Sequence, residues 1–564
     1  MDRYVPLPPL PARISRLNEL AYDLWWSWNA EAREVFRDLD YPLWRFTDHN
    51  PVLLLHLVES DRLEHAAADP EFLRFYDQAI AALDVVRSGT GSWWSCRSSP
   101  PGDDQRPVAY VAPAFSLHQA LPLDGDGAAV AAGDFCKEAS DLGVPLVGVG
   151  LMHPRGHTHQ KLSGDGWQME STEFLDWSDK PIVPVILPDG TRLAFTIPLA
   201  GLPGDVRVQV WQVRAGRATL YLLDPDVPEN APADRALSAA CSQEDTTLLE
   251  RRRALLDGGA ARTLAALGIH PAGSIDPSRG VPPGVHVPGW LARDVAVLVE
   301  RYLGAGWRDH QDDARWWAAM SAIPDGELWA ARQRLRNYLI DFTRARARRR
   351  WTREQASGAV LVAQGTLLDP GALTIGFASR VGDDLRPDLV FHDAERLAAI
   401  LTARRRPVQI IFAGRAHAGD EAAKHHLKRL FTRALDPMFG GRIAFLEDYD
   451  LHAARLLVQG CDLWLSMPPA GGSASLGALK AAINGVPQIA IEPFAHDAAG
   501  ARAFYRRLEE EIVPAFYLRD RAGVPVEWVG RVRDTVRTAI PACSARRGVK
   551  AATERLYNPA LRHV

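Results

Sequence analysis

The sequence predicts an α/β protein with two doubly wound, Rossmann-like sheets and a helical N-terminal domain. Short apolar runs typical of buried parallel strands alternate with amphipathic runs typical of helices, first from Pro107 and again from Leu373. The first ninety or so residues show helical periodicity alone. We therefore expect a helical domain over 1–90, a first half with a helical connection over 107–352, a second half over 353–526, and helices over 527–564 that cross back to the first half.

The composition is that of an ordinary soluble, multidomain protein. A chain of 564 residues is too long for one hydrophobic core. Its net charge of −4 gives no reason to expect nucleic acid or an anionic membrane as a partner. The five cysteines are scattered without a CxxC pair, and the sequence shows no signal peptide and no apolar run of membrane-spanning length. We expect a cytoplasmic location.

The N-terminal domain is predicted from an apolar stripe and a capping signal. Asn29 precedes Ala30-Glu-Ala-Arg and suits the N-cap of a second helix. Residues 88–106 are rich in Gly, Ser and Pro, which indicates a linker. The stripe, at three- and four-residue spacing, consists of Leu17, Leu20, Ala21, Leu24, Trp25 and Trp28.

The strands of both halves are predicted from runs of apolar and β-branched residues. The first half contains Val108–Ala112 and Val144–Leu151, with a helix over Lys137–Leu142 between them. Residues 291–352 are helical and end in the basic run Arg344–Arg350, which we expect to form a solvated face. The second half offers five strands: Leu373–Phe377, Val408–Ala413, Ile443–Leu446, Leu463–Leu465 and Gln488–Ile491.

One segment of the second half carries the clearest chemical signal. Small residues from Ser473 lead into a helix with a single lysine, Lys480. Backbone N–H groups of such a loop can approach a phosphate closely, and a partly desolvated lysine can hold an aldehyde cofactor. Lys480, Ser475 and Gly477 are therefore the predicted cofactor-binding residues. The alternative is ordinary packing at a helix N-terminus, with the lysine facing solvent.

Further motifs follow in order along most of the chain. They are Leu20–Asn29, Thr47–Pro51, Ala139–Leu151, Leu222–Asn230, Phe412–His417, Phe445–Asp450 and Arg455–Gly460. With the lysine segment they resemble the α-glucan (glycogen and maltodextrin) phosphorylases of the short bacterial type. The resemblance implies a GT-B-like fold whose two halves face a central cleft. It also implies pyridoxal phosphate on Lys480 and conversion of α-1,4-glucan and phosphate to glucose 1-phosphate.

The resemblance assigns residues to the phosphate site, and the chain departs from the family there. The family motif R-F-A-T-Y-K-R corresponds to Arg380–Arg386, which implies Arg380 as the catalytic cation and Arg386 and Arg415 as residues of the phosphate cleft. Leu385 replaces the family's lysine, and two aspartates precede it. Like charges about 4 Å apart repel by roughly 4 kcal/mol at an effective dielectric of 20, so these changes oppose phosphate.

The glycine-rich loop of the first half is altered as well. The family has G-G-L-G where this chain has Asp126-Gly127-Ala128-Ala129. The resemblance puts Gly127 in the phosphate cleft, while Asp126 would repel an anion at the helix N-terminus. The alternative is that Gly127 and Gly133 serve only a turn and close packing.

Two segments of the family have no counterpart in the chain. Only Ala272–Pro283 fills the space where the family carries an N-E-G-H and a T-H-T-P-V-P motif, so the sugar-binding histidine is absent. His286, from the next motif, N-G-V-H, is retained as a substrate-cleft residue although Pro283 replaces the Asn. A second stretch is missing after Gly485, where Glu492 could fill part of the space.

These losses favour a degenerate, noncatalytic member of the family that binds glucan and acts as a regulator or scaffold. Two alternatives stay open: an active pyridoxal-phosphate-dependent phosphorylase, and a GT-B glycosyltransferase with another donor. α-Glucan or maltodextrin is the expected ligand. A catalytic phosphorylase homologue is a candidate partner, and a homodimer is compatible with the family.

Two further groupings of polar residues carry less weight. His153, His157 and His159 lie close in sequence, but no Cys, Asp or Glu completes a metal site, and a loop is favoured. Glu447 and Asp448 are neighbours whose side chains should point apart, which fits paired acid–base catalysis poorly. No metal is predicted.

Overall fold

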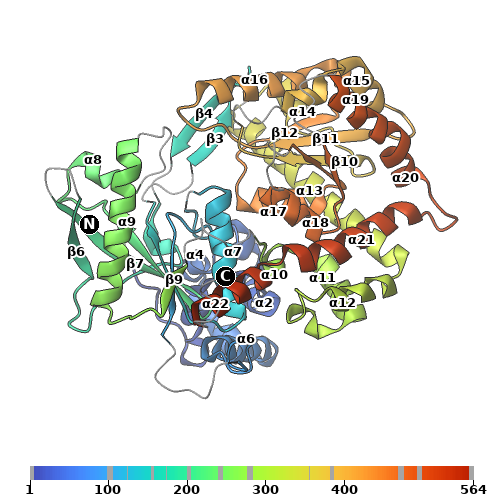
Figure 1. Cartoon of the computed structure of the whole chain (residues 1–564). Helices are drawn as coiled ribbons and strands as arrows, with labels where there is room; N and C mark the ends of the chain where they lie inside the picture. Colours follow the sequence, from blue (N-terminus) through green and yellow to red (C-terminus); the bar gives the residue numbers. More distant parts are fainter. Residues whose placement is uncertain are drawn as a thin grey trace. The chain divides into compact units, whose positions relative to one another are not determined.

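The computed structural model of the chain forms two compact units (Figure 1). Unit 1 comprises Met1–Thr158, Thr172–Gly289 and Ala545–Val564, and unit 2 comprises His159–Ser171 and Trp290–Ser544. This division into two units does not test the four domain boundaries expected from the sequence, which stay a prediction. The structure describes residues 5–97, 106–123, 125–153, 158–172, 175–199, 205–238, 246–275, 284–354, 356–381, 387–467, 475–491 and 498–557.

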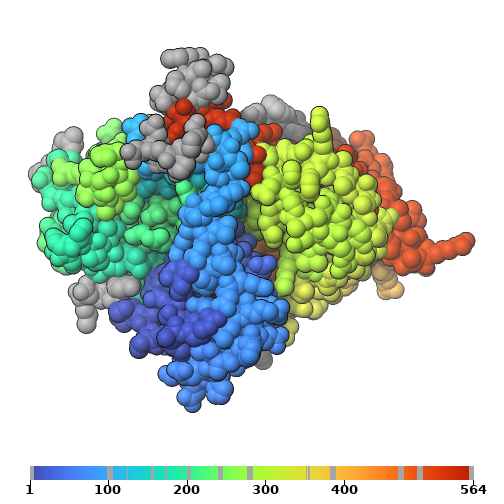
Figure 2. All heavy atoms as spheres, turned by 90° about the horizontal axis from the view of Figure 1, so that it is seen from below, coloured from blue at the N-terminus to red at the C-terminus, as the bar shows by residue number. Residues whose placement is uncertain are grey.

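Unit 1 begins with short helices that bury aromatic side chains. Asn29 caps the second of them as predicted, its Oδ1 accepting from the Ala32 N–H at 2.8 Å. The fully buried Trp26 packs edge-to-face on Phe36 and Trp44. Figure 2 shows these helices in blue on one face of the molecule. They are α1 (Leu17–Ala21), α2 (Ala30–Leu39), α3 (Tyr41–Phe46), α4 (Pro51–Leu57), α5 (Ser60–Ala68) and α6 (Pro70–Ser88).

The sheet of unit 1 combines a parallel part with an antiparallel edge. Its strand order is β5-β7-β8-β2-β1-β9, and β6 pairs with β7. The pairs among β9, β1, β2 and β8 are parallel, and those of β7 are antiparallel. The strands are β1 (Val108–Val111), β2 (Leu146–Leu151), β5 (Val183–Pro184), β6 (Ala194–Pro198), β7 (Asp205–Ala215), β8 (Ala218–Asp224) and β9 (Gly273–Ile275). The two predicted strands are confirmed as β1 and β2.

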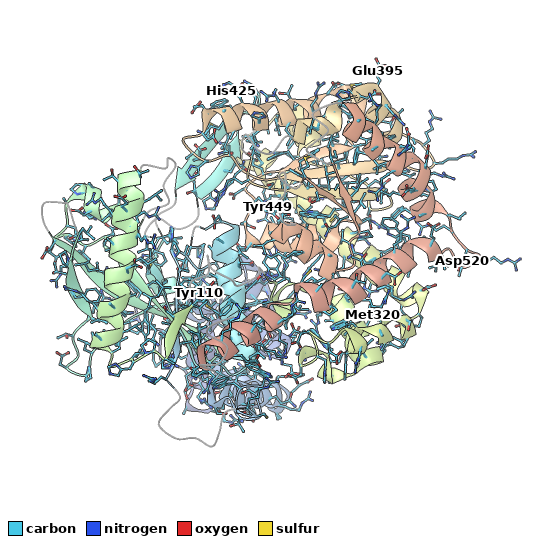
Figure 3. The ribbon with its side chains drawn as sticks, viewed as in Figure 1. Tyr110, Met320, Glu395, His425, Tyr449 and Asp520 are labelled. Carbon is cyan, nitrogen blue, oxygen red and sulfur yellow. The ribbon has the colours of Figure 1, made fainter. Side chains whose placement is uncertain are left out.

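Alternate side chains of this sheet enter two different cores. Tyr110 of β1, labelled in Figure 3, stacks on Phe135 of helix α7 (Gly127–Asp141) with ring centroids 4.8 Å apart. Val149 and Leu223 lie in the second core, together with Leu255 of helix α9 (Thr246–Ala266). The period of two along a strand thus places α7 and α9 against opposite faces of the sheet. The remaining helices are α8 (Pro232–Arg235), α10 (Val287–Trp290) and α22 (Ala545–Tyr557).

The main sheet of unit 2 is parallel, with strand order β12-β11-β10-β13-β14. In this doubly wound order the chain starts at the central strand, winds outward to one edge, and then reverses to the other. All five predicted strands are confirmed. They are β10 (Leu373–Ala378), β11 (Val408–Ala413), β12 (Ile443–Leu446), β13 (Leu463–Ser466) and β14 (Gln488–Ala490).

Helices cover both faces of this sheet, as Figure 1 shows. The helices of unit 2 are α11 (Arg293–Leu303), α12 (Ala314–Trp317), α13 (Asp325–Glu354), α14 (Gly358–Ala363), α15 (Ala394–Leu401), α16 (Glu421–Leu435), α17 (Leu451–Gly460), α18 (Leu476–Ile483), α19 (Ala498–Arg507), α20 (Val513–Tyr517) and α21 (Val526–Cys543), of which α11 and α12 pack on other helices. Across the described parts of the chain, we find no helix long and apolar enough to cross a bilayer.

The prediction of a solvated face for the basic run Arg344–Arg350 is wrong for three of its arginines. Arg344 donates to the carbonyl of Leu368, Arg346 pairs with Asp450 at 3.0 Å, and Arg350 pairs with Glu447 at 2.7 Å. The run lies on α13, and its helical period turns these side chains toward neighbouring loops. Periodicity alone could not show where those acceptors lie.

Candidate functional site

The candidate site of unit 2 lies at the carboxyl ends of its parallel strands. The winding direction reverses between β10 and β13, and ligands of open α/β sheets bind outside the strand ends at such a point. Arg380 follows β10, Arg415 follows β11, and the helix that carries Lys480 follows β13. Three predicted site residues thus come from segments that leave the same edge of one sheet.

Lys480 is buried, with 6% of its surface exposed. Its Nζ lies 3.8 Å from the ring centroid of Trp290, which is itself 3% exposed. The alternative of a solvent-facing lysine is therefore wrong. A cation this close to an indole face is held by the ring quadrupole, typically by about 0.5–2 kcal/mol.

A hydrogen-bond network fixes Trp290 beside the lysine helix. The Asn484 Nδ2 donates to the carbonyls of Trp290 and Lys480 at 3.0 and 2.8 Å, and its Oδ1 accepts from the Ala292 N–H. The Gln459 Nε2 donates to the same Trp290 carbonyl at 2.9 Å. The indole is thus a fixed wall of the lysine site, although no motif in the sequence pointed to it.

Ser475 and Gly477 shape the start of α18. The Ser475 Oγ accepts from the Ala478 N–H at 3.2 Å and caps the helix, and this hydroxyl keeps its own hydrogen to donate. A Cβ on Gly477 would come within 2.9 Å of a ring carbon of Trp464, which is fully buried. Gly477 therefore serves close packing of α18 on the sheet. Ser473 lies outside the described residues.

Arg380 and Arg415 lie in loops that touch each other. The Val381 N–H donates to the Arg415 carbonyl at 3.1 Å, and a Cβ on Gly414 would approach the Ser379 carbonyl oxygen to 2.0 Å. The Arg380 side chain is exposed and that of Arg415 is half-buried. The backbone thus brings together two cations that the sequence had predicted for the phosphate cleft. Arg386 and the two aspartates of its motif lie outside the described residues.

A hairpin that sequence reasoning missed covers the ends of β11 and β12. Its strands are β3 (Thr158–Leu162) and β4 (Gln168–Thr172). The Gln160 Nε2 donates to the Gly414 carbonyl at 3.0 Å, and the Gln168 Oε1 accepts from the Ala416 N–H at 2.9 Å. Because both strands are rich in polar residues, reading the sequence for apolar runs and motifs did not predict the hairpin.

Glu447 and Asp448, which follow β12, contact this hairpin, and of the histidines that the structure describes there, only His159 belongs to it. The His159 Nδ1 lies 2.9 Å from Asp448, while Glu447 pairs with Arg350 at 2.7 Å. Both carboxylates accept from backbone N–H groups of β3, Asp448 from Gln160 and Glu447 from Leu162, so their proximity serves the hairpin contact. His153 is buried, and His157 lies outside the described residues. Within the described part of the chain, no group of three or more His, Cys, Asp or Glu could hold a metal ion.

In unit 1, the N-terminus of α7 is occupied by the chain's own carboxylate. The Asp126 Oδ1 accepts from the N–H groups of Ala128 and Ala129 at 2.9 and 3.1 Å. Gly127, the first residue of the helix, is exposed. Gly133, one turn and a half further on, serves packing, because a Cβ there would lie 2.2 Å from the Ser116 carbonyl oxygen. An anion approaching this helix end would meet a negative charge.

His286 is fully buried and packs against polar side chains of α7. Its Nε2 lies 2.9 Å from the Asp141 Oδ2, and its ring packs edge-to-face on Trp28. One turn earlier, Glu138 pairs with Arg546 of α22 at 3.0 Å, and both side chains are buried. Burial raises the pKa of Glu138, and the charges of Arg546 and His286 oppose that rise.

The residues of the lysine site fit a pyridoxal aldehyde phosphate in their chemistry. A buried primary amine lies next to an aromatic wall, and the first turn of α18 presents N–H groups and a serine hydroxyl, the donors that a phosphate needs. The tight packing of Gly477 also fits a helix start that must stay close to the sheet.

Comparison with known proteins gives relatives over nearly the whole chain. The glycogen phosphorylase of Aquifex aeolicus is 30% identical, covering 96% of this chain and 98% of that protein. The maltodextrin phosphorylase of Thermococcus litoralis is 26% identical over 98% of this chain and 82% of its own length. The glycogen phosphorylase of Mycobacterium bovis is 28% identical, with coverage of 99% and 83%. Residues 10–121 also match a family described as "Protein of unknown function (DUF3417)".

The alignment lengths carry structural information of their own. The match to the Aquifex protein runs over 690 positions, although this chain has 564 residues. The relative therefore carries internal segments without a counterpart here.

Proposed function

Because this chain belongs to the glycogen phosphorylase family, we propose that it binds α-1,4-glucan while its phosphorolysis of that glucan is lost or strongly impaired. The observation that carries the proposal is Asp126, whose carboxylate takes the N–H groups at the start of α7. Family resemblance places a glycine-rich phosphate loop at that point. A carboxylate there repels phosphate dianions and removes two donors that would otherwise hold them.

The missing segments support the same proposal. The family's sugar-binding histidine belongs to a motif with no counterpart between His270 and Gly284. The excess of aligned positions over chain length agrees with internal losses. Since loss of one well-placed donor alone costs about 10²–10³ in rate, several losses together leave little turnover.

Pyridoxal phosphate is proposed as the cofactor, held by Lys480. When bound, it would supply a phosphate group beside the substrate site. The chain's own part is to bind and orient: Lys480 holds the aldehyde, Trp290 forms one wall, and Ser475 with the α18 N–H groups takes the phosphate.

The assay for activity uses the intact protein with maltoheptaose, phosphate and pyridoxal phosphate, and measures glucose 1-phosphate. We expect release well below the range of typical enzymes, roughly 1–10³ per second. Calorimetric titration with maltoheptaose alone measures glucan binding separately. Turnover within the enzyme range would refute the loss of phosphorolysis, and absence of glucan binding would refute the binding role.

The cofactor proposal has its own test. The purified protein should retain an absorbance band of bound pyridoxal phosphate after dialysis, and borohydride should fix the label on Lys480. Lys480→Ala should lose the band, whereas Lys428→Ala should keep it, because Lys428 is an exposed lysine of the same unit that pairs with Asp165. Equal retention by both variants would exclude Lys480.

An active phosphorylase is the second candidate, and one observation favours it. Arg380 and Arg415 lie in adjoining loops at the sheet edge from which the Lys480 helix also leaves. Together with Arg386, which lies outside the described residues, they are the cations that the family resemblance assigns to the phosphate site and that the sequence retains. The activity assay decides between the candidates, and turnover with another glycosyl donor would indicate the transferase alternative.

For a noncatalytic member, we propose a regulatory role, with a catalytic phosphorylase homologue as partner. The five cysteines are scattered along the sequence without a CxxC pair, which supports a cytoplasmic location. Co-sedimentation of the purified chain with an active phosphorylase, with and without glycogen, tests the partnership.

A further inference from the structure

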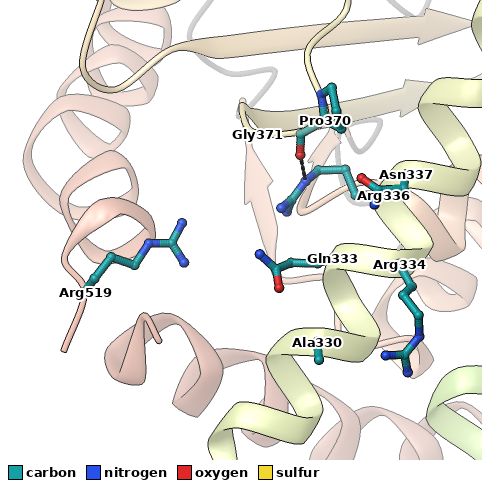
Figure 4. Close-up of a pocket in the computed structure, with 8 residues that line it drawn as sticks. All are labelled: Ala330, Gln333, Arg334, Arg336, Asn337, Pro370, Gly371 and Arg519. Carbon is teal, nitrogen blue, oxygen red and sulfur yellow. Dashed lines mark hydrogen bonds between the residues drawn. The ribbon is translucent and has the colours of Figure 1, made fainter. Parts of the chain in front are cut away.

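A cavity of about 430 Å³ in unit 2 has five lining residues whose side chains carry hydrogen-bond donors: Gln333, Arg334, Arg336, Asn337 and Arg519. Figure 4 shows it between α13 and the turn at Pro370–Gly371, with Arg519 on the opposite side. Helix α13 contributes Ala330, Gln333 and Asn337, which share one face at intervals of three and four residues. In the figure, the side chains of Gln333 and Arg519 point toward one another across the cavity.

Two guanidinium groups of this cavity are held by one pair of aromatic rings. Trp329 and Phe516 pack edge-to-face with centroids 5.6 Å apart. Arg336 lies 5.4 Å from the centroid of each ring, and Arg519 lies 4.5 Å from Trp329 and 5.5 Å from Phe516. Cation–π attraction to these rings favours the two guanidinium positions before any ligand arrives.

The charges around the cavity do not cancel. Arg334 pairs with Asp294 at 2.5 Å, and Arg336 pairs with Asp462 at 2.7 Å. Within the described residues, no carboxylate forms an ion pair with Arg519. The nearby buried Arg332 donates to backbone carbonyls. The negative charge of Asp462 acts on Arg332 as well as on Arg336. The cluster therefore holds more cations than carboxylates.

The partners of Arg336 show how the cavity wall is built. Its Nε donates to the Pro370 carbonyl at 2.6 Å, drawn as a dashed line in Figure 4, and its Nη1 bonds Asp462. These bonds fix a side chain that still lines the cavity, and a guanidinium has five N–H donors. Partial burial, and after it repulsion from Arg336, lower the pKa of Arg519.

We propose that this cavity is a binding site for a small phosphorylated metabolite, separate from the lysine site. The planar guanidinium of Arg519 binds the phosphate group through two N–H donors, and the amides of Gln333 and Asn337 donate further hydrogen bonds. The positive charge of Arg336 adds electrostatic attraction. Phosphate fits better than an apolar ligand because the two aromatic rings are buried beneath guanidinium groups. The volume lies within the usual range of small-molecule sites, about 300–1,000 Å³.

The test is calorimetric titration of the full chain with inorganic pyrophosphate at low ionic strength. Wild-type protein should bind it saturably. Arg519→Gln should weaken binding by about tenfold or more, the loss typical of one charge-assisted contact. Gln333→Glu, on the exposed face of α13, should weaken it at least as much by adding a negative charge.

The matched control is Arg521→Gln, which removes one exposed cation two residues away without touching the cavity lining. It should change the affinity less than twofold. Circular dichroism and thermal melting check that each variant folds. If Arg519→Gln does not fold, Gln333→Glu still tests the site. The proposal is overturned if wild-type protein shows no saturable binding. It is also overturned if the control weakens binding as much as Arg519→Gln, or if neither cavity variant weakens it.

Discussion

Single residues set the local charge at two helix starts, one in each unit. At α18 a serine hydroxyl caps the helix and keeps a hydrogen to donate, whereas at α7 the carboxylate of Asp126 accepts two N–H bonds. Both residues are good N-caps, so propensity alone treats them alike. The two caps differ in charge. Only the neutral serine leaves a helix N-terminus that attracts an anion.

Substitution of Asp126 tests whether this carboxylate stabilises the fold. Asp126→Ala should lower the free energy of unfolding by about 1 kcal/mol, the usual cost of losing an N-cap. Asp126→Asn keeps the acceptor and should cost clearly less. Chemical denaturation measures both variants. Equal losses would mean that the cap bond contributes little and that charge at the helix end dominates.

Arg546 should matter more as the pH rises. The pKa of Glu138 is raised in the folded protein, so the ionised form is destabilised there, and folding stability falls as pH increases from the ordinary glutamate range toward the folded value. Arg546→Met removes the charge that opposes this rise. Breaking such a buried pair typically costs about 3–5 kcal/mol.

The measurement is denaturant unfolding of Arg546→Met and of Arg546→Met with Glu138→Gln, at pH 5 and pH 8. Relative to wild type, Arg546→Met should lose more stability at pH 8 than at pH 5. The double variant should lose the same amount at both pH values. A loss that is the same at both pH values would show that Arg546 acts through packing alone.

At the scale of elements, contact between the loops after β10 and β11 depends on one glycine. Gly414 has φ 138° and lies where a Cβ would meet the Ser379 carbonyl oxygen at 2.0 Å. Gly414→Ala should cost about 3 kcal/mol through strain and overpacking. Gly530→Ala is the control: Gly530 lies in α21 with open space around its Cα, so stability should rise by about 0.5–1 kcal/mol.

The readout is thermal unfolding of both variants, with maltoheptaose binding as a second measurement. If the two loops line the glucan site, Gly414→Ala should bind maltoheptaose more weakly as well as being less stable. Tolerance of alanine at 414 would contradict the loop contact.

Strand positions were predictable, whereas the side-chain neighbours of the site were not. The five strands of the second sheet are short apolar runs bounded by turn residues, a local signal. Burial of Lys480 depends on Trp290, a residue far away in sequence that Asn484 holds in place. The hairpin β3–β4 is polar, and its glutamines bond each other as well as backbone groups of loops that come much later in the chain.

For the whole molecule, the two units should unfold in separable steps. Each unit has its own sheet, and a chain of this size departs readily from two-state behaviour. Calorimetry should show two overlapping transitions. Arg546→Met should lower one and Gly414→Ala the other by several degrees, because the two residues lie in different units. A single transition shifted by both variants would mean that the units melt together.

The hairpin His159–Ser171 also constrains how this protein is made in a cell. It is synthesised early, between segments of unit 1, yet the backbone groups that it bonds follow β11 and β12. At roughly 5–20 residues per second, the ribosome delivers those partners on the order of tens of seconds later. During that interval the nascent hairpin has no native surface to join. Chaperones that shield growing chains are therefore expected to engage this stretch, and no contiguous fragment of the gene would encode either unit completely.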